Sequence, residues 1–213
     1  MIMTGNSLFE QLIEDLESWP GIGPRQARRL AYWLAGQPRF KLIRTGNLLQ
    51  KLPEVTKMCH DCKRLFWSES QDSLCSWCRN LARKDATQLM IVEKDIDMDN
   101  VQKISDFQGY FFVLGGLLPL NDKGRNTLRL SSLKSLIEKK ITEGKLKEVI
   151  FALSVSPEGD HTVDHLKQEL KPFLVDKDIT VSILGRGLSA GTDLEYLDPE
   201  TLKNAWRNRQ NHN

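Results

Sequence analysis

Residues 59–78 read CHDCKRLFWSESQDSLCSWC, and this stretch decides how the chain is organised. It holds two Cys-x2-Cys pairs, Cys59 with Cys62 and Cys75 with Cys78, separated by twelve residues. Two such pairs can present four thiolates tetrahedrally to Zn²⁺, whereas a redox site or a buried thiol needs no doubled motif. Because cysteine fills all four positions, no ligand place remains for a substrate, and we expect a structural zinc ion.

The stretch before the cysteines predicts three helices. A capping box at Ser7 begins the first helix, and two prolines and two glycines within residues 19–24 end it. A second helix follows and ends at Gly36. A third is expected over residues 40–52, with Pro53 marking its end.

The turn between the first two helices, Pro-Gly-Ile-Gly-Pro-Arg, resembles the helix-hairpin-helix DNA-binding motif. Small residues let backbone N–H groups come close to a phosphate, and nearby arginines add positive charge. Such contacts position a DNA backbone and read no sequence. The alternative is a corner between helices whose arginines only keep the surface solvated. The candidate DNA-binding residues are Gly21, Gly23, Arg25, Arg28 and Arg29.

After residue 85 the pattern changes to short apolar runs that alternate with amphipathic stretches. The runs predict strands at 89–92, 110–114, 149–153 and 179–184, with helices between them at 133–141 and 162–174. Strands alternating with helices favour a parallel sheet covered on both faces. The fold class is therefore α/β, in several parts.

Carboxylates follow two of these predicted strands. Glu93 comes directly after the first strand, and Glu158 and Asp160 stand just beyond the third. If the two strands are neighbours, these side chains converge at one edge of the sheet, where oxygen ligands suit Mg²⁺. The alternative is that they are ordinary acidic loops. A further acidic run, Asp95, Asp97 and Asp99, is interpreted as solvated surface.

Composition narrows the class of protein without giving a function. The chain has 213 residues, a formal net charge of +2 and 40% hydrophobic residues, as expected for a globular protein. Overall charge thus gives no argument for nucleic acid, and only the local placement of arginines does. Neither a signal peptide nor an apolar run long enough to span a membrane is found, so we expect a cytoplasmic protein whose cysteines are reduced.

The order of these parts resembles the bacterial RecR family of recombination mediators over nearly the whole chain. Short sequence strings typical of the family occur in every part of the chain. The N-terminal part has Pro-Gly-Ile-Gly-Pro at 20–24 and the cysteine quartet. The later part has Ile-Val-Glu at 91–93 with Asp97, residues 112–116, residues 149–152, Glu-Gly-Asp at 158–160, and Gly187 with residues 193–198. The resemblance implies four regions: a helix-hairpin-helix region at 1–54, a four-cysteine zinc finger at 55–84, a Toprim-like α/β domain at 85–185 and a C-terminal Walker-B-like assembly segment at 186–213.

The resemblance also implies a function and partners. A protein of this family would form a tetrameric ring that clamps DNA near the nucleoid. With RecO and RecF it would help load RecA at single-strand gaps. Arg25 and Arg29 match the family's DNA-contacting positions, and the Toprim acidic positions, linked with partner and DNA binding, correspond to Glu93, Asp97, Glu158 and Asp160.

Two other functions remain open. The principal rival is a Mg²⁺-dependent Toprim enzyme that cleaves DNA. A topoisomerase needs a nucleophilic tyrosine, and the three tyrosines available lie on the hairpin helix, at a buried strand and in a late loop. We therefore expect no enzymatic activity. The second rival is a zinc-ribbon nucleic-acid-binding module with no assembly role.

Overall fold

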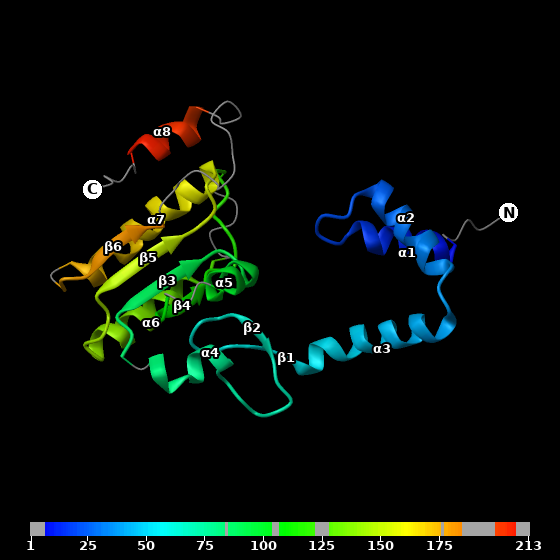
Figure 1. Ribbon diagram of the computed structural model, residues 1–213, viewed down its shortest axis with the longest axis horizontal. Coiled ribbons are helices and arrows are strands. Elements are labelled where there is room, and N and C mark those ends of the chain that lie inside the picture. Colours follow the sequence, from blue (N-terminus) through cyan, green and yellow to red (C-terminus); the bar gives the residue numbers. More distant parts are fainter. Residues whose placement is uncertain are drawn as a thin grey trace, which may run out of the picture. The chain divides into compact units, whose positions relative to one another are not determined.

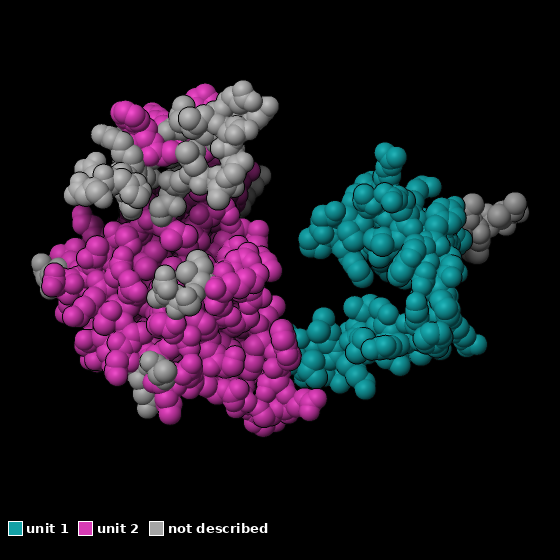
Figure 2. All heavy atoms as spheres, viewed as in Figure 1, with its two compact units in different colours: residues 1–56 teal, residues 57–213 magenta. Residues whose placement is uncertain are grey.

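The computed structural model describes residues 7–83, 85–103, 107–121, 128–175, 177–184 and 199–207. The chain divides into two compact units, residues 1–56 and residues 57–213 (Figure 2). The Walker-B-like stretch at 193–198 and Gly187 lie outside the described residues, and of the C-terminal segment the structure describes helix α8, Pro199–Arg207.

The first unit is built from helices α1 (Leu8–Glu17), α2 (Pro24–Ala35) and α3 (Arg39–Val55) (Figure 1). The predicted capping box is confirmed: Glu10 N–H donates to Ser7 Oγ at 3.2 Å, and Ser7 N–H donates to Glu10 Oε2 at 2.9 Å. Gly36 ends α2 as predicted.

A small core holds α1 against α2. Its buried members are Ile13, Leu16, Ala27 and Ala31. The two alanines are completely buried, because their short side chains let the helices come close together. The pair is therefore a helical hairpin with its own hydrophobic centre.

The prediction that α3 stops at Pro53 is wrong, since the helix continues to Val55. Proline removes one backbone donor, so α3 lacks the hydrogen bond that residue 53 would give to Leu49 O, yet the helix continues past it. Thr56 closes the end of the helix, since both its backbone N–H and its side-chain hydroxyl donate to Leu52 O. Helix α3 contains no buried residue.

The second unit contains the predicted parallel sheet, whose strand order is β4-β3-β5-β6. All four predicted strands are confirmed within a residue or two at their ends: β3 (Gln88–Val92), β4 (Tyr110–Val113), β5 (Glu148–Ala152) and β6 (Thr180–Ile183). The helices that follow them are α5 (Asp95–Gln102), α6 (Leu130–Thr142) and α7 (Pro157–Leu174).

Residues 56–83, which we call the cysteine finger, precede this sheet. They form two short strands that pair with each other and two short helices. These elements are β1 (Thr56–Met58), β2 (Leu65–Trp67), α4 (Ser76–Arg79) and the 3₁₀ helix η1 (Leu81–Arg83).

The two faces of the sheet are covered differently. Helices α6 and α7 bury one face with residues such as Leu133 and Leu166 against Ile91 and Phe151. The opposite face carries Met90 and other alternate strand residues, which pack in one cluster with Met98 of α5 and three buried cysteines. The fourth, Cys78, is half-buried and packs against the same cluster. The prediction of a sheet covered on both faces is confirmed, with the cysteine finger as part of one cover.

The architecture is thus the multi-part α/β fold expected from the sequence. In the part of the chain that the structure describes, no helix is both long enough and apolar enough to cross a membrane.

Candidate metal centre and nucleic-acid interface

Two tight turns present the four cysteines. In the first, Cys59 N–H donates to Arg64 O at 2.8 Å and Lys63 N–H donates to Cys59 O at 3.1 Å. Lys63 adopts a left-handed φ of 60°, which turns the chain back on itself. In the second, Cys75 precedes helix α4, and Arg79 N–H donates to Cys75 O at 3.0 Å.

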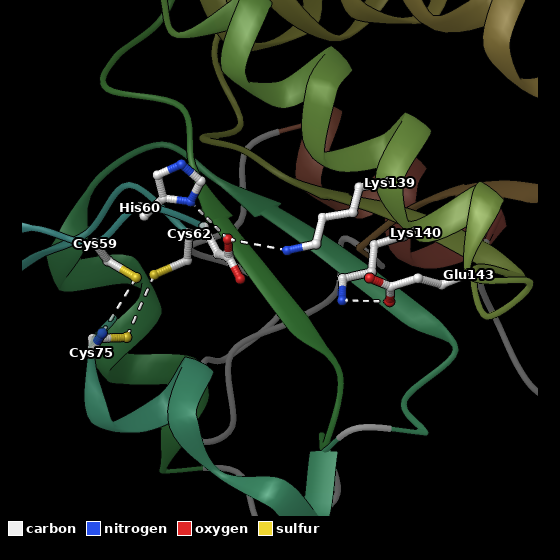
Figure 3. Close-up of polar contacts among 8 residues, drawn as sticks. Cys59, His60, Cys62, Cys75, Lys139, Lys140 and Glu143 are labelled. Atoms are coloured by element: carbon white, nitrogen blue, oxygen red, sulfur yellow. Dashed lines mark hydrogen bonds and ion pairs between the residues drawn. The ribbon is translucent and has the colours of Figure 1, made fainter. Parts of the chain in front are cut away.

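The four sulfur atoms gather at one point. Their Sγ atoms all lie within 4.8 Å of one another, and Cys62 Sγ lies 3.6 Å from Cys75 Sγ. Figure 3 shows Cys59, Cys62 and Cys75 facing one another. In a tetrahedral site with Zn–S bonds of about 2.3 Å, neighbouring sulfurs lie about 3.8 Å apart. The arrangement therefore fits a four-coordinate metal ion held by sulfur.

The four thiols lie close enough to change one another's pKa. Hydrogen bonds from Cys62 and Cys75 lower the pKa of Cys59 well below its ordinary value. Contacts with Cys59 and Cys62 raise the pKa of Cys78. The site thus stabilises thiolate at one sulfur at the expense of another, and a bound metal ion would relieve this competition because it favours thiolate at every ligand.

Hydrogen bonds dock the finger onto edge strand β4 and its surroundings. Val113 N–H donates to Cys62 O at 2.8 Å, so a strand amide is paired with a metal-ligand residue. Trp77 Nε1 donates to Gly109 O at 3.1 Å, and Arg129 Nη1 donates to Lys63 O at 2.6 Å. The metal centre is therefore built into the α/β body.

Acidic residues of α5 complete this docking. Asp95 Oδ1 accepts from Leu65 N–H at 2.6 Å, and Asp99 Oδ1 lies 2.8 Å from Arg64 Nη2. Asp97 caps its own helix by accepting from Lys94 N–H at 2.9 Å. The interpretation of these aspartates as solvated surface is wrong, because each has a specific partner and two of the partners lie in the finger.

A second set of charges joins the finger to α6 (Figure 3). Asp61 Oδ1 lies 3.1 Å from His60 Nδ1 and 3.6 Å from Lys139 Nζ. Lys140, one residue further along α6, pairs with Glu143 at 3.0 Å instead. The His60 side chain is mostly exposed and stands outside the group of metal-capable residues.

Glu93 lies where the sequence placed it, directly after β3, and it is almost fully buried. Its carboxylate accepts a hydrogen bond from Ser154 Oγ and pairs with Lys94 Nζ at 2.7 Å. Burial acts to raise the pKa of Glu93, but the contacts with Lys94 and Ser154 outweigh it and hold the pKa below its ordinary value. Glu93 is therefore an ionised, internally paired group.

The other two Toprim-position carboxylates are in a helix and not, as predicted, in a loop. Helix α7 begins at Pro157, so Glu158 and Asp160 lie in its first turn, where negative charge is favourable. Strands β3 and β5 are neighbours as the prediction required. Among the described residues, however, the cysteines form the only gathered set of three or more potential ligands, and a magnesium site has no support.

The helical hairpin exposes every residue proposed for DNA contact. Gly21 has a φ of +78°, which side chains disfavour, whereas Gly23 has an ordinary φ of −85°. A Cβ at either position would meet nothing within 4 Å. Packing within the chain therefore does not require glycine at position 23. Because Gly23 has no side chain, the backbone at the start of α2 stays accessible to a ligand.

Together, a helix-hairpin-helix unit, a four-cysteine metal centre and an α/β body define a class of DNA-handling protein with a built-in structural metal site. Family models agree with this order of parts. The RecR helix-hairpin-helix model matches residues 9–54, the Toprim domain model residues 87–185 and the RecR C-terminal model residues 187–210.

Relatives match along almost the whole chain. The Recombination protein RecR of Legionella pneumophila subsp. pneumophila (strain Philadelphia 1) is 33% identical over 208 residues, covering 97% of this chain and 98% of the relative. The protein of the same name from Cutibacterium acnes is 32% identical and covers 94% of each. That from Thermobifida fusca is also 32% identical, over 94% of this chain and 95% of the relative. The chain belongs to the RecR family.

Proposed function

We propose that the chain is a DNA-binding recombination mediator that acts as an oligomeric scaffold in recombinational DNA repair. Family membership over nearly the full length supports the mediator role. In the finer picture, a tetrameric ring clamps DNA in the nucleoid region of the cytoplasm. RecO-like and RecF-like proteins then join it to load a RecA-type recombinase at single-strand gaps.

The exposed arginines of α2 carry the DNA-binding part of this proposal. Arg25, Arg28 and Arg29 are all exposed, and none of them pairs with a carboxylate in the described part of the chain. Unpaired guanidinium groups beside a helix N-terminus suit a phosphate backbone, because both supply positive potential to the same anion. The proposed DNA contacts are these arginines with the backbone at Gly21 and Gly23.

The metal centre has a structural task in this proposal. Zinc is the ion that four thiolates in tetrahedral arrangement favour. Held there, it fixes the cysteine finger against strand β4 and so completes one cover of the sheet. We propose four functional regions: the helix-hairpin-helix region at 1–54, the zinc finger at 55–84, the Toprim-like domain at 85–185 and the assembly segment at 186–213.

The Toprim domain serves as a docking platform. The chain belongs to a family of recombination mediators and is not a catalytic enzyme. Glu93 is occupied by Ser154 and Lys94, which suits a positioning role better than a metal-binding one. We assign the half-buried Asp97 and Glu158 and the exposed Asp160 to contacts with partner proteins or DNA.

The test joins assembly and DNA binding in one experiment. Zinc-replete protein is sized by light scattering with and without DNA, beside the double variant Arg25→Ala/Arg29→Ala. We expect an oligomer whose affinity for DNA falls in the variant, similarly for all sequences, and whose salt dependence flattens by roughly one unit of slope per arginine removed. A monomer at micromolar concentration would refute the scaffold, and unchanged affinity would refute the hairpin contact.

A further inference from the structure

Helix α2 carries a second kind of side chain on its DNA-facing side. Successive residues of an α-helix are about 100° apart, so positions three and four apart share a face. The face opposite the core residues of α2 carries five side chains in two adjoining rows: Arg25, Arg28, Arg29, Tyr32 and Trp33. Arg29 precedes Trp33 by one turn, and Arg28 precedes Tyr32 by one turn. Cationic groups nearer the start of the helix and aromatic groups one turn further on therefore share one exposed surface, which we call the α2 platform.

The aromatic rings of the platform are open. Tyr32 is 69% exposed and Trp33 is 59% exposed. Tyr32 touches Phe9 of α1, with ring centroids 5.0 Å apart and the rings tilted. No described cation stacks on either platform ring, whereas arginine and lysine do cover Trp77 and Tyr110 in the other unit. Trp33 thus presents a large flat apolar surface to the solvent among unpaired positive charges.

The positive charges of the platform indicate which kind of molecule binds to it. A second copy docking through the same face in a two-fold dimer would bring two sets of unpaired guanidinium groups together, which is unfavourable. Residues 24–35 contain no acidic side chain that could neutralise them. A phosphate backbone neutralises all of these groups, and nucleobases provide flat partners for the rings. Nucleic acid therefore satisfies both kinds of side chain at once.

The rings further distinguish single strands from duplexes. In a duplex the base faces are already stacked on one another, and only edges and backbone are accessible. In a single strand the faces are free, and stacking on an aromatic side chain adds affinity with little regard to sequence. Arginines alone give no such preference, since both forms carry phosphates.

We infer that the α2 platform binds single-stranded DNA, with the arginines on the phosphates and Trp33, flanked by Tyr32, stacked on the bases. This inference rests on the DNA binding proposed above and adds the strand preference and the residues that produce it. Single-strand gaps would then be recognised through the free faces of their unpaired bases.

The test compares one aromatic and one basic variant on two ligands. The full chain is titrated with a thymine oligonucleotide of about 20 nucleotides, longer than the roughly 4–16 nucleotides that single-strand-binding folds cover, and with a duplex of the same length. We expect Trp33→Ala to weaken single-strand binding roughly fivefold to hundredfold, as measured for stacked bases elsewhere, with an unchanged salt slope. Duplex affinity should stay within about twofold, since no stacking is lost there.

Matched variants make the outcome specific. Trp33→Phe retains an aromatic ring and should recover much of the affinity. Trp67→Ala removes a tryptophan that is 80% exposed on β2 of the other unit, and it should leave both affinities unchanged. Fluorescence quenching by the thymine strand should be smaller in Trp33→Phe than in the wild type, because the quenched indole is missing.

The possible failures are distinguishable. If Arg25→Ala/Arg29→Ala weakens binding of both ligands while Trp33→Ala changes neither, the DNA-binding proposal stands and the stacking inference fails. If Trp33→Ala weakens both ligands equally, the strand preference is refuted. If Trp33→Ala lowers the oligomer mass while DNA affinity is kept, the platform is a contact between copies of the chain, and the inference is again overturned.

Discussion

Gly159 offers the sharpest test of the packing at the Toprim edge. It occupies the first turn of α7, directly after the loop that follows β5. A Cβ built on it would lie 1.9 Å from the carbonyl oxygen of Ser154, although real Cβ atoms essentially never come within 3.0 Å of such an atom. In Gly159→Ala the two backbones must therefore separate by at least 1.1 Å. Ser154 is the residue that donates to Glu93, so the shift also disturbs the buried carboxylate.

The magnitude follows from two opposing effects. Alanine is favoured over glycine inside a helix by about 1 kcal/mol, which acts to stabilise the variant. Forcing extra volume into a packed site costs about 1–3 kcal/mol, and a clash with backbone, which cannot rotate away, belongs at the upper end. We expect a net loss of about 2 kcal/mol in the free energy of unfolding. That corresponds to a melting temperature lower by roughly 4–8 °C.

Urea unfolding followed by circular dichroism measures this loss. The midpoint should fall without a change of slope, since the surface exposed on unfolding is the same. Gln168→Ala, at an exposed position of the same helix, is the matched control and should stay within about 0.5 kcal/mol of the wild type. Equal midpoints for the two variants would show that the loop can move freely, and the reasoning from Gly159 would be refuted.

Three further predictions concern the metal, a buried charge and a helix cap. Cys62→Ser, or chelation, should abolish binding of the proposed zinc ion and lower the melting temperature of the α/β unit, because the finger helps to cover one face of its sheet. Elemental analysis with thermal unfolding tests this, and a zinc-free chain of unchanged stability would contradict it. Folding lowers the pKa of Glu93, so the ionised carboxylate stabilises the folded state. This stabilisation is fully present at a pH above the pKa of the unfolded chain, about 4.3, and is lost as the pH falls through the lower pKa of the folded protein. Unfolding of Glu93→Gln should accordingly depend less on pH over that acidic range than unfolding of the wild type, and parallel profiles would count against the assignment. Ser7→Ala should lower the free energy of unfolding of the first unit by about 1 kcal/mol, because the capping box is lost. The loss should be visible as a weaker helical circular dichroism signal, and an unchanged spectrum and unfolding midpoint would contradict it.

The elements of the fold were predictable because their signals are local. Short β-branched and aromatic runs define β3 to β6, and the spacing of apolar residues defines α1, α2 and α6. Helix ends predicted from the positions of prolines were less reliable. Pro53 was expected to end α3, but proline costs the helix a single hydrogen bond, and α3 continues to Val55. The start of α7 was missed for a related reason, since Pro157 opens the helix and Ser156 caps it.

The contacts of the acidic residues could not be predicted, because their partners are far away in the sequence. Asp95 and Asp99 look like solvated surface until the fold brings Leu65 and Arg64, 30 and 35 residues earlier, against them. Glu93 could be placed at a strand end from the sequence, yet its pairing with Ser154 depends on a loop 61 residues away. A local pattern gives the position of such a group along the chain and not the group that neutralises it.

These long-range contacts explain why the metal centre and the sheet depend on each other. The finger alone is two short strands and two helices of three or four residues, too little to bury a core. It gains one from the sheet, where Cys59, Cys62 and Cys75 join Met90 and Phe111 in a single cluster. Without the finger, that apolar face of the sheet would keep only part of its cover, from α5 and Phe107. Metal binding, finger folding and sheet burial should therefore occur together. The helical hairpin lies in a separate compact unit and has its own core, so we expect that its proposed DNA contacts can be altered without disturbing the body that carries the cysteines.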